Sequence, residues 1–576
     1  MLARSGSAKF ISNFLAAPVW PSLHHPHRSF SQTTRPNPDH LFGYMPQLTV
    51  IEKLRLTSTR WPTRRTFAAT AHPPSPSSDP LFNYTSGLWL YNKDLRLEER
   101  TRFFNVDELC RLAAESVGRR LDDVAGLKKL AGGGFNRTFL ITMHDGFQMV
   151  GRIPYPVTVP KPFAIASEVA TMAFLRSRGL PIPEIFDYSL KPDNAAGTEY
   201  ILMAYVDGDS LDNIWHDLTE DQIDSFFRQF TEIEARMMSI PFPAGGSLYF
   251  TEDLKTLLAG SSSERGIPLA DDQSFCVGPD TSVPLWYGRR SELSLGRGPY
   301  TSAEAALEGV AKKELAFLQK FGQPLLPFQR ERREAYGYEK QSQWDHVENL
   351  LRYLSIASSL VSGNSDLCRF CIRHFDAQLG NFIVLRQPDS NDLRIIGIID
   401  FQHTPILPMF LLAGVPQALQ NYDDLYLRNT AKYNEPHHAA LEDPMGALRR
   451  LLFFHARNPW EGETLALKVA LIKLTENWET LVGEGLPCPI EFDPADVGKT
   501  MALHAEQKKA DMNLQVLQNL VGFVSEGWVP AEHYEEAKTR SEELKRKVLE
   551  VAETKKERNE IMENWPLDDM DEKDYM

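Results

Sequence analysis

The chain has 576 residues, with 62 Lys or Arg against 77 Asp or Glu, so its formal net charge is −15. This length is too great for a single hydrophobic core, and the acidic balance disfavours a protein that works by coating nucleic acid. Five cysteines are too few for a disulfide scaffold, and no apolar run approaches the ~18–20 residues of a membrane-spanning helix. We therefore expect a globular, multi-lobed protein of a reducing compartment, with no nucleic-acid partner and no transmembrane segment.

The first 78 residues differ from the rest in charge. They hold nine basic and two acidic residues, a net +7, which leaves −22 for the remainder. An acid-poor segment that contains Arg and Ser is typical of a mitochondrial presequence, because the inside-negative membrane potential draws positive segments inward. Arg28-Ser29-Phe30-Ser31 and, more weakly, Arg65-Thr66-Phe67-Ala68 fit cleavage three residues after an Arg. We predict a targeting segment over 1–67 and a Pro/Ser linker over 68–80; a basic tail without a targeting role is the alternative.

Residues 81–207 predict a small antiparallel sheet that carries one helix. Gly132, Gly133 and Gly134 form a glycine-rich turn between two strand-like runs, and Asp145-Gly146 marks a hairpin. Helices are expected over 106–117 and 164–178, and a further strand over 200–206. We interpret this region as an N-terminal lobe.

Residues 208–530 predict a mostly helical C-terminal lobe. Gly and Pro are frequent in 241–300, which we interpret as a long irregular insertion. Other predicted elements are two apolar strands over 367–372 and 395–401, and long helices over 462–483 and 495–523. The charged stretch 530–565 has little apolar stripe, so within 531–576 we expect a solvated or peripherally docked helix and an acidic tail.

The segment 373–381 carries the spacing H-x-D-x-x-x-x-N between the two apolar strands, with His374, Asp376 and Asn381 at the fixed positions. Asp400 follows nineteen residues after Asn381, at the end of the second strand. Phosphoryl transfer from ATP needs one carboxylate to orient the attacking hydroxyl, and an Asn oxygen and a second carboxylate to hold Mg²⁺. His374 is a candidate base, although a buried structural histidine beside Asp400 is the stronger alternative.

Further residues appear in the chain order that a kinase-like fold requires. The glycine turn 132–134 precedes Arg152 at a strand end, and Glu168 lies on the next helix, where it can pair with Arg152. Each feature has a simpler alternative, a flexible turn for the glycines and an ordinary surface ion pair for Arg152 and Glu168. Cys368 and Cys371 have C-x-x-C spacing without a second pair, which favours core positions over a zinc site.

The motif set resembles the aminoglycoside-phosphotransferase-like branch of the protein-kinase-like fold. The kinase motifs are its most specific part, and the likeness extends over residues 80–530. Within the branch, the chain is similar to a fungal group of mitochondrial-inheritance proteins in the segments LFNYTSGLWLYN (81–92), FNVDELCRLA (104–113), GGGFNRTF (132–139), SEVATM (167–172), GSLYF (246–250), FCVGP (275–279), RGPYTS (297–302), RHFDAQLGNFIV (373–384) and GIIDFQH (397–403).

The resemblance implies an α+β fold of two lobes with ATP in the cleft between them. Asp376 then matches the catalytic base, and Asn381 and Asp400 match the Mg²⁺ ligands. Arg152 takes the place of the usual phosphate-contacting lysine, with Glu168 as its helix partner. The hinge is expected around 203–206, where Met203 and Tyr205 would contact the nucleotide.

Two departures from the family pattern bear on activity. Arg152 replaces a lysine with a larger guanidinium that is always charged, and Phe401-Gln402-His403 follows Asp400 where a glycine-containing turn is usual. Our first hypothesis is a mitochondrial, Mg²⁺- and ATP-dependent phosphotransferase for a small molecule, and the acidity of the chain favours a cationic acceptor over an anionic one. The alternative is a kinase-shaped, non-catalytic nucleotide-binding or scaffold protein for mitochondrial maintenance.

Overall fold

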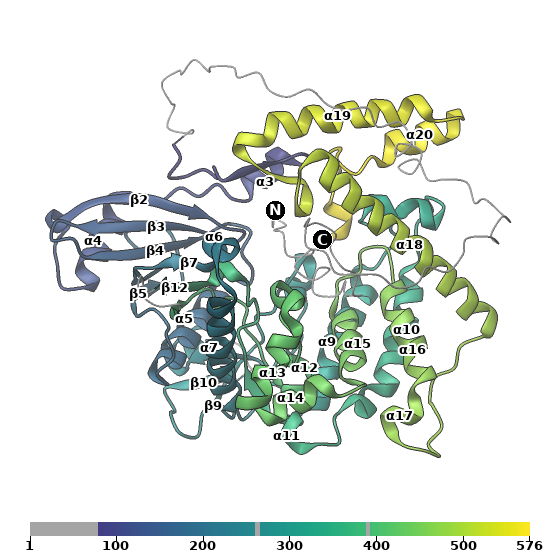
Figure 1. The fold of residues 1–576 in the computed structure, drawn as a ribbon, viewed down its shortest axis with the longest axis horizontal. Coiled ribbons are helices and arrows are strands. Elements are labelled where there is room, and N and C mark those ends of the chain that lie inside the picture. Colours follow the sequence, from purple (N-terminus) through teal and green to yellow (C-terminus); the bar gives the residue numbers. More distant parts are fainter. Residues whose placement is uncertain (1–78, 260–264, 387–391) are drawn as a thin grey trace, which may run out of the picture.

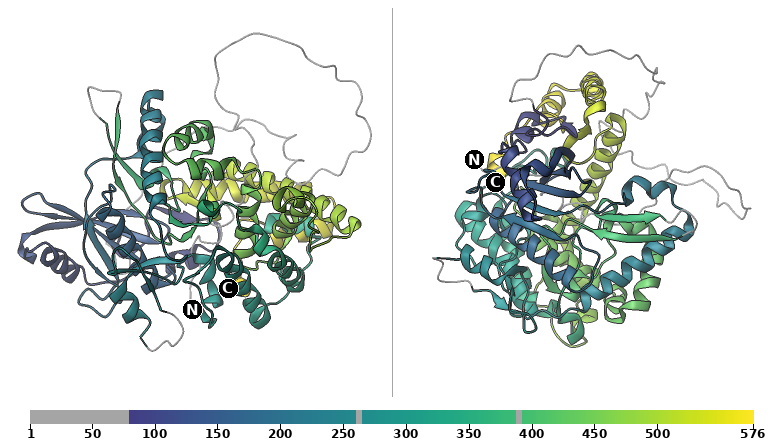
Figure 2. Two further views of the ribbon diagram at one scale, coloured as in Figure 1. Left: turned by 90° about the horizontal axis from the view of Figure 1, so that it is seen from below. Right: turned by 90° about the vertical axis from the view of Figure 1, so that its left-hand side faces the viewer.

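The structure is a computed structural model that describes residues 79–259, 265–386 and 392–576. The predicted targeting segment 1–67 lies outside the described residues. The described chain forms a sheet-based lobe at one end of the molecule and a larger helical lobe beside it (Figures 1 and 2). The predicted α+β, two-lobed kinase-like fold is therefore confirmed.

The smaller lobe is built on a five-stranded antiparallel sheet. In spatial order its strands are β2 (Val124–Gly132), β3 (Asn136–Met143), β4 (Gln148–Pro154), β6 (Tyr200–Ala204) and β5 (Ile185–Ser189). Successive side chains of a strand point to opposite faces of the sheet. Leu202 accordingly belongs to the apolar cluster of α4 (Val106–Ser116), whereas Ile201 and Met203 belong to that of α5 (Lys161–Ser177). The two helices predicted in this lobe are thus α4 and α5, on opposite faces.

Helices make up most of the larger lobe. Their bounds are α6 (Leu211–Ile214), α7 (Glu220–Ser239), α9 (Ala303–Phe321), α10 (Gln343–Ile356), α12 (Met409–Leu412), α13 (Asp423–Tyr433), α14 (Glu435–Glu442), α15 (Gly446–Arg457), α16 (Leu465–Glu476) and α17 (Trp478–Val482). Helix α7 buries Phe226 and Phe230 edge-on against Phe382, with ring centroids 5.4 and 5.3 Å apart. This packing fixes the start of the strand that follows the predicted catalytic loop.

Two short antiparallel strand pairs hold that loop. Strand β11 (Phe370–Ile372) pairs with β14 (Ile406–Pro408), and β12 (Phe382–Arg386) lies between β13 (Leu393–Ile398) and β7 (Asp209–Ser210). The predicted strand 367–372 begins later than expected, because the Asn364 side chain caps a short helix, α11 (Ser365–Cys368). The loop 373–381 therefore joins two anchored strands.

The segment 241–300 is more regular than its composition predicts. It contains a three-stranded sheet of order β8-β10-β9 and one helix, with the bounds β8 (Ser247–Phe250), α8 (Thr251–Leu257), β9 (Ile267–Pro268) and β10 (Phe275–Gly278). The glycines that suggested irregular chain mark close approaches instead: Gly246 has φ +144°, and a Cβ there would lie 2.2 Å from the Gly278 carbonyl oxygen. Strand β8 packs on α5, so the insertion is tied to the helix of the N-terminal lobe.

The two ends of the described chain join in one further unit. Strand β1 (Gly87–Trp89) pairs antiparallel with β15 (Trp528–Pro530), beside helices α3 (Lys93–Glu98), α18 (Pro494–Val521), α19 (Tyr534–Val551) and α20 (Lys555–Asn564). A Cβ at Gly87 would lie 2.4 Å from the Trp528 ring, so only glycine allows this approach. We call this unit the terminal cap; in Figure 1 it lies above the helical lobe and reaches the inner end of the smaller lobe.

A buried charge cluster ties the C-terminal segment to the cap. Glu572 accepts from Arg96 at 2.5 Å and from Asn92 at 2.8 Å, and Arg96 also pairs with Glu99 at 3.1 Å. All four side chains are buried, so removing one charge leaves the others poorly compensated.

We predict that Glu572→Gln lowers the free energy of unfolding by about 1.5–3 kcal/mol, the value of a charge-assisted hydrogen bond. Denaturant titration followed by circular dichroism measures this loss. Asp571→Asn is the matched control, since its carboxylate is exposed and 3.6 Å from Lys573, and it should cost below about 1 kcal/mol. Equal stability of the two variants would contradict a stabilising role for the cluster.

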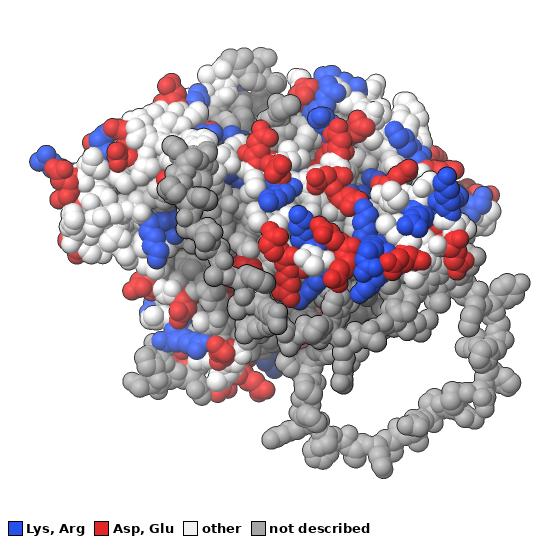
Figure 3. Space-filling view, turned by 90° about the horizontal axis from the view of Figure 1, so that it is seen from above, with Lys and Arg blue, Asp and Glu red and all other residues white. Residues whose placement is uncertain are grey.

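Positive and negative side chains are interspersed on the outer face of the terminal cap. On the face seen in Figure 3, Lys and Arg side chains alternate with Asp and Glu. Several form pairs one helical turn apart, such as Arg540 with Glu536 and Arg546 with Glu550 on α19. Among the described residues, no helix combines the length and the apolar character needed to cross a membrane.

Candidate active site

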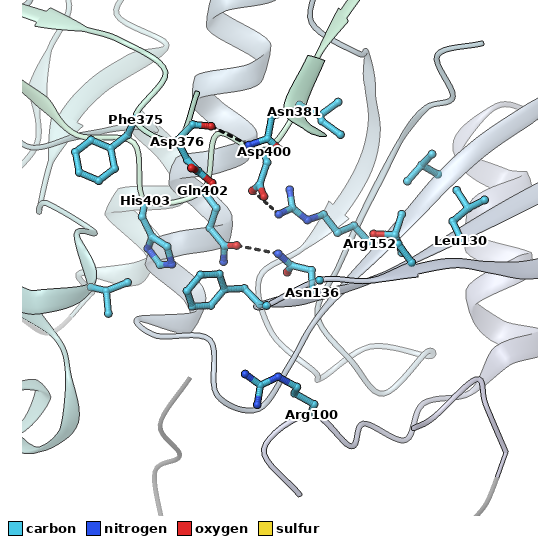
Figure 4. A pocket seen from close by; sticks show the side chains of 18 of the residues that line it. Arg100, Leu130, Asn136, Arg152, Phe375, Asp376, Asn381, Asp400, Gln402 and His403 are labelled. Carbon is cyan, nitrogen blue, oxygen red and sulfur yellow. Dashed lines mark hydrogen bonds and ion pairs between the residues drawn. The ribbon is translucent and has the colours of Figure 1, made fainter. Parts of the chain in front are cut away.

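A cavity of about 600 Å³ lies where the two lobes, the insertion and the terminal cap meet. Eight of the predicted site residues line it: Gly133, Gly134, Arg152, Met203, Tyr205, Asp376, Asn381 and Asp400. Figure 4 shows the polar members of this set pointing toward one another across the cavity. Gly132, Glu168 and His374 do not line it.

The loop 373–381 and the end of β13 bring Asp376, Asn381 and Asp400 together. The Asn381 side-chain amide donates to the Asp376 main-chain carbonyl at 2.8 Å, and the Ile399 amide donates to the Asn381 carbonyl at 3.0 Å. Asp400 has φ +67°, a left-handed conformation that is rare outside glycine and costs of the order of 1 kcal/mol. The backbone is thus held in an unfavourable conformation at the point where it presents a carboxylate to the cavity.

The pKa of Asp376 is raised to about 7. Burial is the main cause, and the nearby negative charge of Asp400 adds to it. At neutral pH this carboxylate is therefore divided between its protonated and ionised forms. A general base works best when its pKa lies near the working pH. Asp376 has the position and the proton affinity of such a base.

Arg152 lies at the centre of an ion-pair network. Its guanidinium pairs with Glu168 of α5 and, through Nη2, with Asp400 Oδ1 at 2.5 Å. The side-chain amide of Asn136 lies between Arg152, at 2.6 Å, and Gln402, at 2.8 Å. Burial alone would raise the pKa of Asp400, but the charge and hydrogen bond of Arg152, together with His374 and His403, outweigh burial and lower this pKa. The network links the N-terminal lobe directly to the predicted metal ligand.

His374 lies behind the cavity wall. Its Nε2 is 2.9 Å from the Ile399 carbonyl oxygen, and its ring packs edge-on against Phe401 at 4.6 Å between centroids. The ring is 2% exposed, and burial lowers its pKa, so the imidazole is neutral. A donated hydrogen bond to Ile399 positions the residue before Asp400, and the His374 ring is not among the residues that line the cavity.

The glycine turn and the hinge form the opposite end of the cavity. A Cβ at Gly134 would meet open space, whereas one at Gly132 would lie 3.0 Å from the Tyr155 hydroxyl. Gly134 therefore leaves backbone free to approach a ligand, while Gly132 serves packing. Between this turn and the hinge the wall is apolar, with Leu130, Val150, Ile383 and Ile399 beside Met203 and Tyr205.

Several lining residues were not predicted from the sequence. Asn136 and Gln402 were part of recognised motifs, GGGFN and DFQH, but had no assigned role. His403 donates through Nδ1 to the Thr281 carbonyl of the insertion at 2.9 Å and has φ +60°, the conformation for which a glycine would be suited. Burial lowers its pKa to about 4, so it is neutral. The insertion adds Ser282, Val283 and Pro284, and the cap adds Trp89, Arg100, Glu526 and Trp528.

The donor set fits a magnesium ion that shares its coordination with a nucleotide. Asn381 and Asp400 supply oxygen atoms at one cavity wall, and Asp400 Oδ2 accepts no hydrogen bond from the described residues. Two protein ligands suffice for Mg²⁺ when phosphates and water complete its shell. Within the described ranges, no group of three or more His, Cys, Asp and Glu side chains is arranged to hold a metal without such help.

Residues 126–409 match the model of the phosphotransferase enzyme family. The match begins in β2 and ends after β14, so it includes every predicted site residue from Gly132 to Asp400. It confirms the resemblance predicted from the motifs. The insertion lies inside the matched range, whereas α15 and the terminal cap lie outside it.

The chain is similar to fungal proteins over most of its length. A subtelomeric hrmA-associated cluster protein of Aspergillus fumigatus is 28% identical over 521 residues, which cover 77% of this chain and 97% of that protein. Altered inheritance of mitochondria protein 9, mitochondrial, of Yarrowia lipolytica is 24% identical over 533 residues, or 80% of this chain and 86% of that protein.

Two solved structures are also similar to the chain. The streptomycin-ATP-APH(2")-IIa ternary complex has 16% identity and a TM-score of 0.33, and the alignment covers 61% of this chain and 92% of that chain. A putative fructosamine-3-kinase from Thermobifida fusca has 16% identity and a TM-score of 0.33, with coverage of 64% and 100%.

Proposed function

We propose that this aminoglycoside phosphotransferase-like chain transfers the γ-phosphoryl group of ATP to a hydroxyl group of a small molecule, in mitochondria. The observation that carries the proposal is the convergence of Asp376, Asn381, Asp400 and Arg152 on one cavity. The mitochondrial part rests on the net +7 of residues 1–78 and on relatives that are named as mitochondrial proteins.

Each residue has a definite task in this proposal. Asp376 accepts the proton of the acceptor hydroxyl as the bond to phosphorus forms, and its pKa of about 7 suits that role. Asn381 and Asp400 would hold Mg²⁺, which when bound neutralises phosphate charge. Arg152 contacts phosphate oxygens in place of a lysine, with Glu168 fixing its direction. His374 acts as a positioning residue through Ile399.

One observation favours the second candidate, a kinase-shaped nucleotide-binding or scaffold protein without catalysis. The Arg152 guanidinium forms a direct ion pair with Asp400 at 2.5 Å and so engages one oxygen of a proposed metal ligand. In that case Asp376 would be dispensable. Rescue of a null strain by Asp376→Asn protein at normal abundance would favour this candidate, and loss of rescue would favour catalysis.

We expect ATP to raise the melting temperature of the purified chain only when Mg²⁺ is present, and Asp400→Asn to weaken this ATP binding by about tenfold or more, as loss of a charged ligand does. Thermal unfolding with ATP, with and without Mg²⁺, measures the effect. Asp424→Asn is the matched control, because its carboxyl group is exposed on α13, away from the cavity. The absence of an ATP-induced shift with any divalent metal would rule out the phosphotransferase and a nucleotide-binding protein, and would leave only the scaffold.

A further inference from the structure

Arg457, the last residue of α15, lines the cavity on the side of the helical lobe. Its side chain is 3% exposed and packs among aromatic rings, with the guanidinium carbon 5.0 Å from the Phe454 centroid, 5.7 Å from Phe453 and 5.8 Å from Phe375. It lies outside residues 126–409, so the family match assigns it no role.

Among the described residues, no carboxylate forms a salt bridge or hydrogen bond with the Arg457 guanidinium, although the buried carboxyl group of Asp280 attracts it from a greater distance. Its Nε and Nη1 atoms are buried without a hydrogen-bond acceptor, and no carboxylate lies within 4.0 Å of it. Two other buried arginines of this lobe are paired with carboxylates, Arg290 with Glu314 and Arg373 with Glu234. An unpaired buried charge is costly, so its presence at a cavity wall points to a ligand that supplies the missing anion.

Apart from Asp280, the nearby charged side chains add positive charge around Arg457. Lys313 donates to the Arg457 carbonyl oxygen at 3.0 Å, and Lys313 and Arg290 share the single carboxylate of Glu314. The C-terminal end of α15 carries a partial negative charge, but such an end stabilises a cation by only about 0.3–1 kcal/mol. The helix end therefore does not replace an anionic partner for the guanidinium.

The position of Arg457 separates it from the nucleotide contacts. Phe375, which its guanidinium approaches, directly precedes Asp376, and in Figure 4 Phe375 and Arg152 lie on opposite sides of Asp376. The predicted phosphate contacts are on the Arg152 side. Arg457 thus lies on the side of Asp376 away from Arg152, where we expect the acceptor to bind. Val283 and Pro284 of the insertion line the cavity as well.

We propose that Arg457 binds an anionic group of the acceptor, so that the substrate is a hydroxyl compound with an apolar body and a carboxylate or phosphate group. This inference rests on the proposed phosphotransferase function. It differs from the cationic acceptor favoured by the acidity of the chain, because the whole-chain charge includes surface residues such as those in Figure 3, whereas the acceptor contacts the cavity wall.

The test compares matched probes on the full chain: 4-(hydroxymethyl)benzoate, its methyl ester, and benzyl phosphate. We expect the two anions, and not the neutral ester, to raise the melting temperature without nucleotide. Arg457→Met should weaken binding of the anions by about tenfold or more, and Arg457→Lys by less, since a lysine keeps the charge. The carboxylate and phosphate arms then show which anion is preferred.

Arg450→Met is the matched control: Arg450 lies on the same helix and loses the same charge, but it does not line the cavity. It should leave binding of all three probes unchanged, and ATP affinity should be unchanged in both methionine variants. Equal binding of ester and acid, no binding of either anion at millimolar concentration, or a loss of ATP affinity in Arg457→Met would each overturn the inference. A fully folded melting profile for Arg457→Lys guards against misfolding as an explanation.

The outcome separates this inference from the proposed function. Anion binding that depends on Arg457, without phosphate transfer from ATP, would leave the anion site standing and remove the phosphotransferase proposal. Phosphate transfer to a neutral alcohol, unaffected by Arg457→Met, would do the reverse.

Discussion

Asp376→Asn is expected to lower kcat by about 10²–10⁴-fold, the usual contribution of a general base, with little change in the affinity for ATP. Asparagine keeps the size of the side chain but cannot accept the acceptor proton. The Asn381 amide donates to the main-chain carbonyl of residue 376, and this hydrogen bond does not involve the lost carboxylate. Steady-state rates of ADP release with an identified acceptor measure the effect, and an unchanged kcat would refute a catalytic role for Asp376.

The pH dependence provides a second readout of the same residue. Because the pKa of Asp376 is about 7, the wild-type kcat/KM should rise with pH through 7 as the base becomes ionised. In the folded chain this pKa is raised above the ordinary value of 3.8, so its contribution to stability is fully present below about pH 4 and lost as pH rises through 7. Asp376→Asn should therefore have a higher melting temperature than wild type at pH 8, lose most of that advantage at pH 5 and lose all of it below about pH 4.

The catalytic loop was predictable because its geometry is local. His374, Asp376 and Asn381 lie within one loop between two strands, so their spacing alone restricts where their side chains can point. Asp400 comes to the same place because β13 pairs with β12, the strand that begins after Asn381. Short hairpin-like pairing of this kind follows from the alternation of apolar residues.

The terminal cap and the acceptor end were not predictable in the same way. Strands β1 and β15 come from opposite ends of the described chain, and three-residue strands such as GLW and WVP carry no periodic signal that would pair them. Arg457 lies on an ordinary amphipathic helix, and its unpaired state depends on what packs around it. The prediction of an irregular insertion over 241–300 was wrong for a related reason. In the sequence, glycines that allow close contacts between strands cannot be told from glycines of irregular loops.

Arg152→Met is expected to lower the free energy of unfolding by about 3–5 kcal/mol, since it leaves Glu168 buried without its cation. Arg152→Lys should cost less, because lysine can still pair with Glu168, although a single ammonium group cannot also hold Asn136 and Asp400. Denaturant unfolding measures both. In the double variant Arg152→Met with Glu168→Met, much of the lost stability should return. A double-mutant cycle of the two single variants and the double variant then gives the coupling free energy between residues 152 and 168.

The same variants decide what Arg152 does for the nucleotide. If its charge contacts phosphate, Arg152→Lys retains Mg²⁺-dependent ATP binding, while the double methionine variant, in which no buried charge is left unpaired at this position, loses it. If Arg152 serves only to join Glu168 and Asp400, the opposite result is expected. The double variant would then bind ATP as wild type does, because both oxygens of Asp400 would be available. Since stability is restored in the double variant, weakened binding there reports the loss of a phosphate contact and not unfolding.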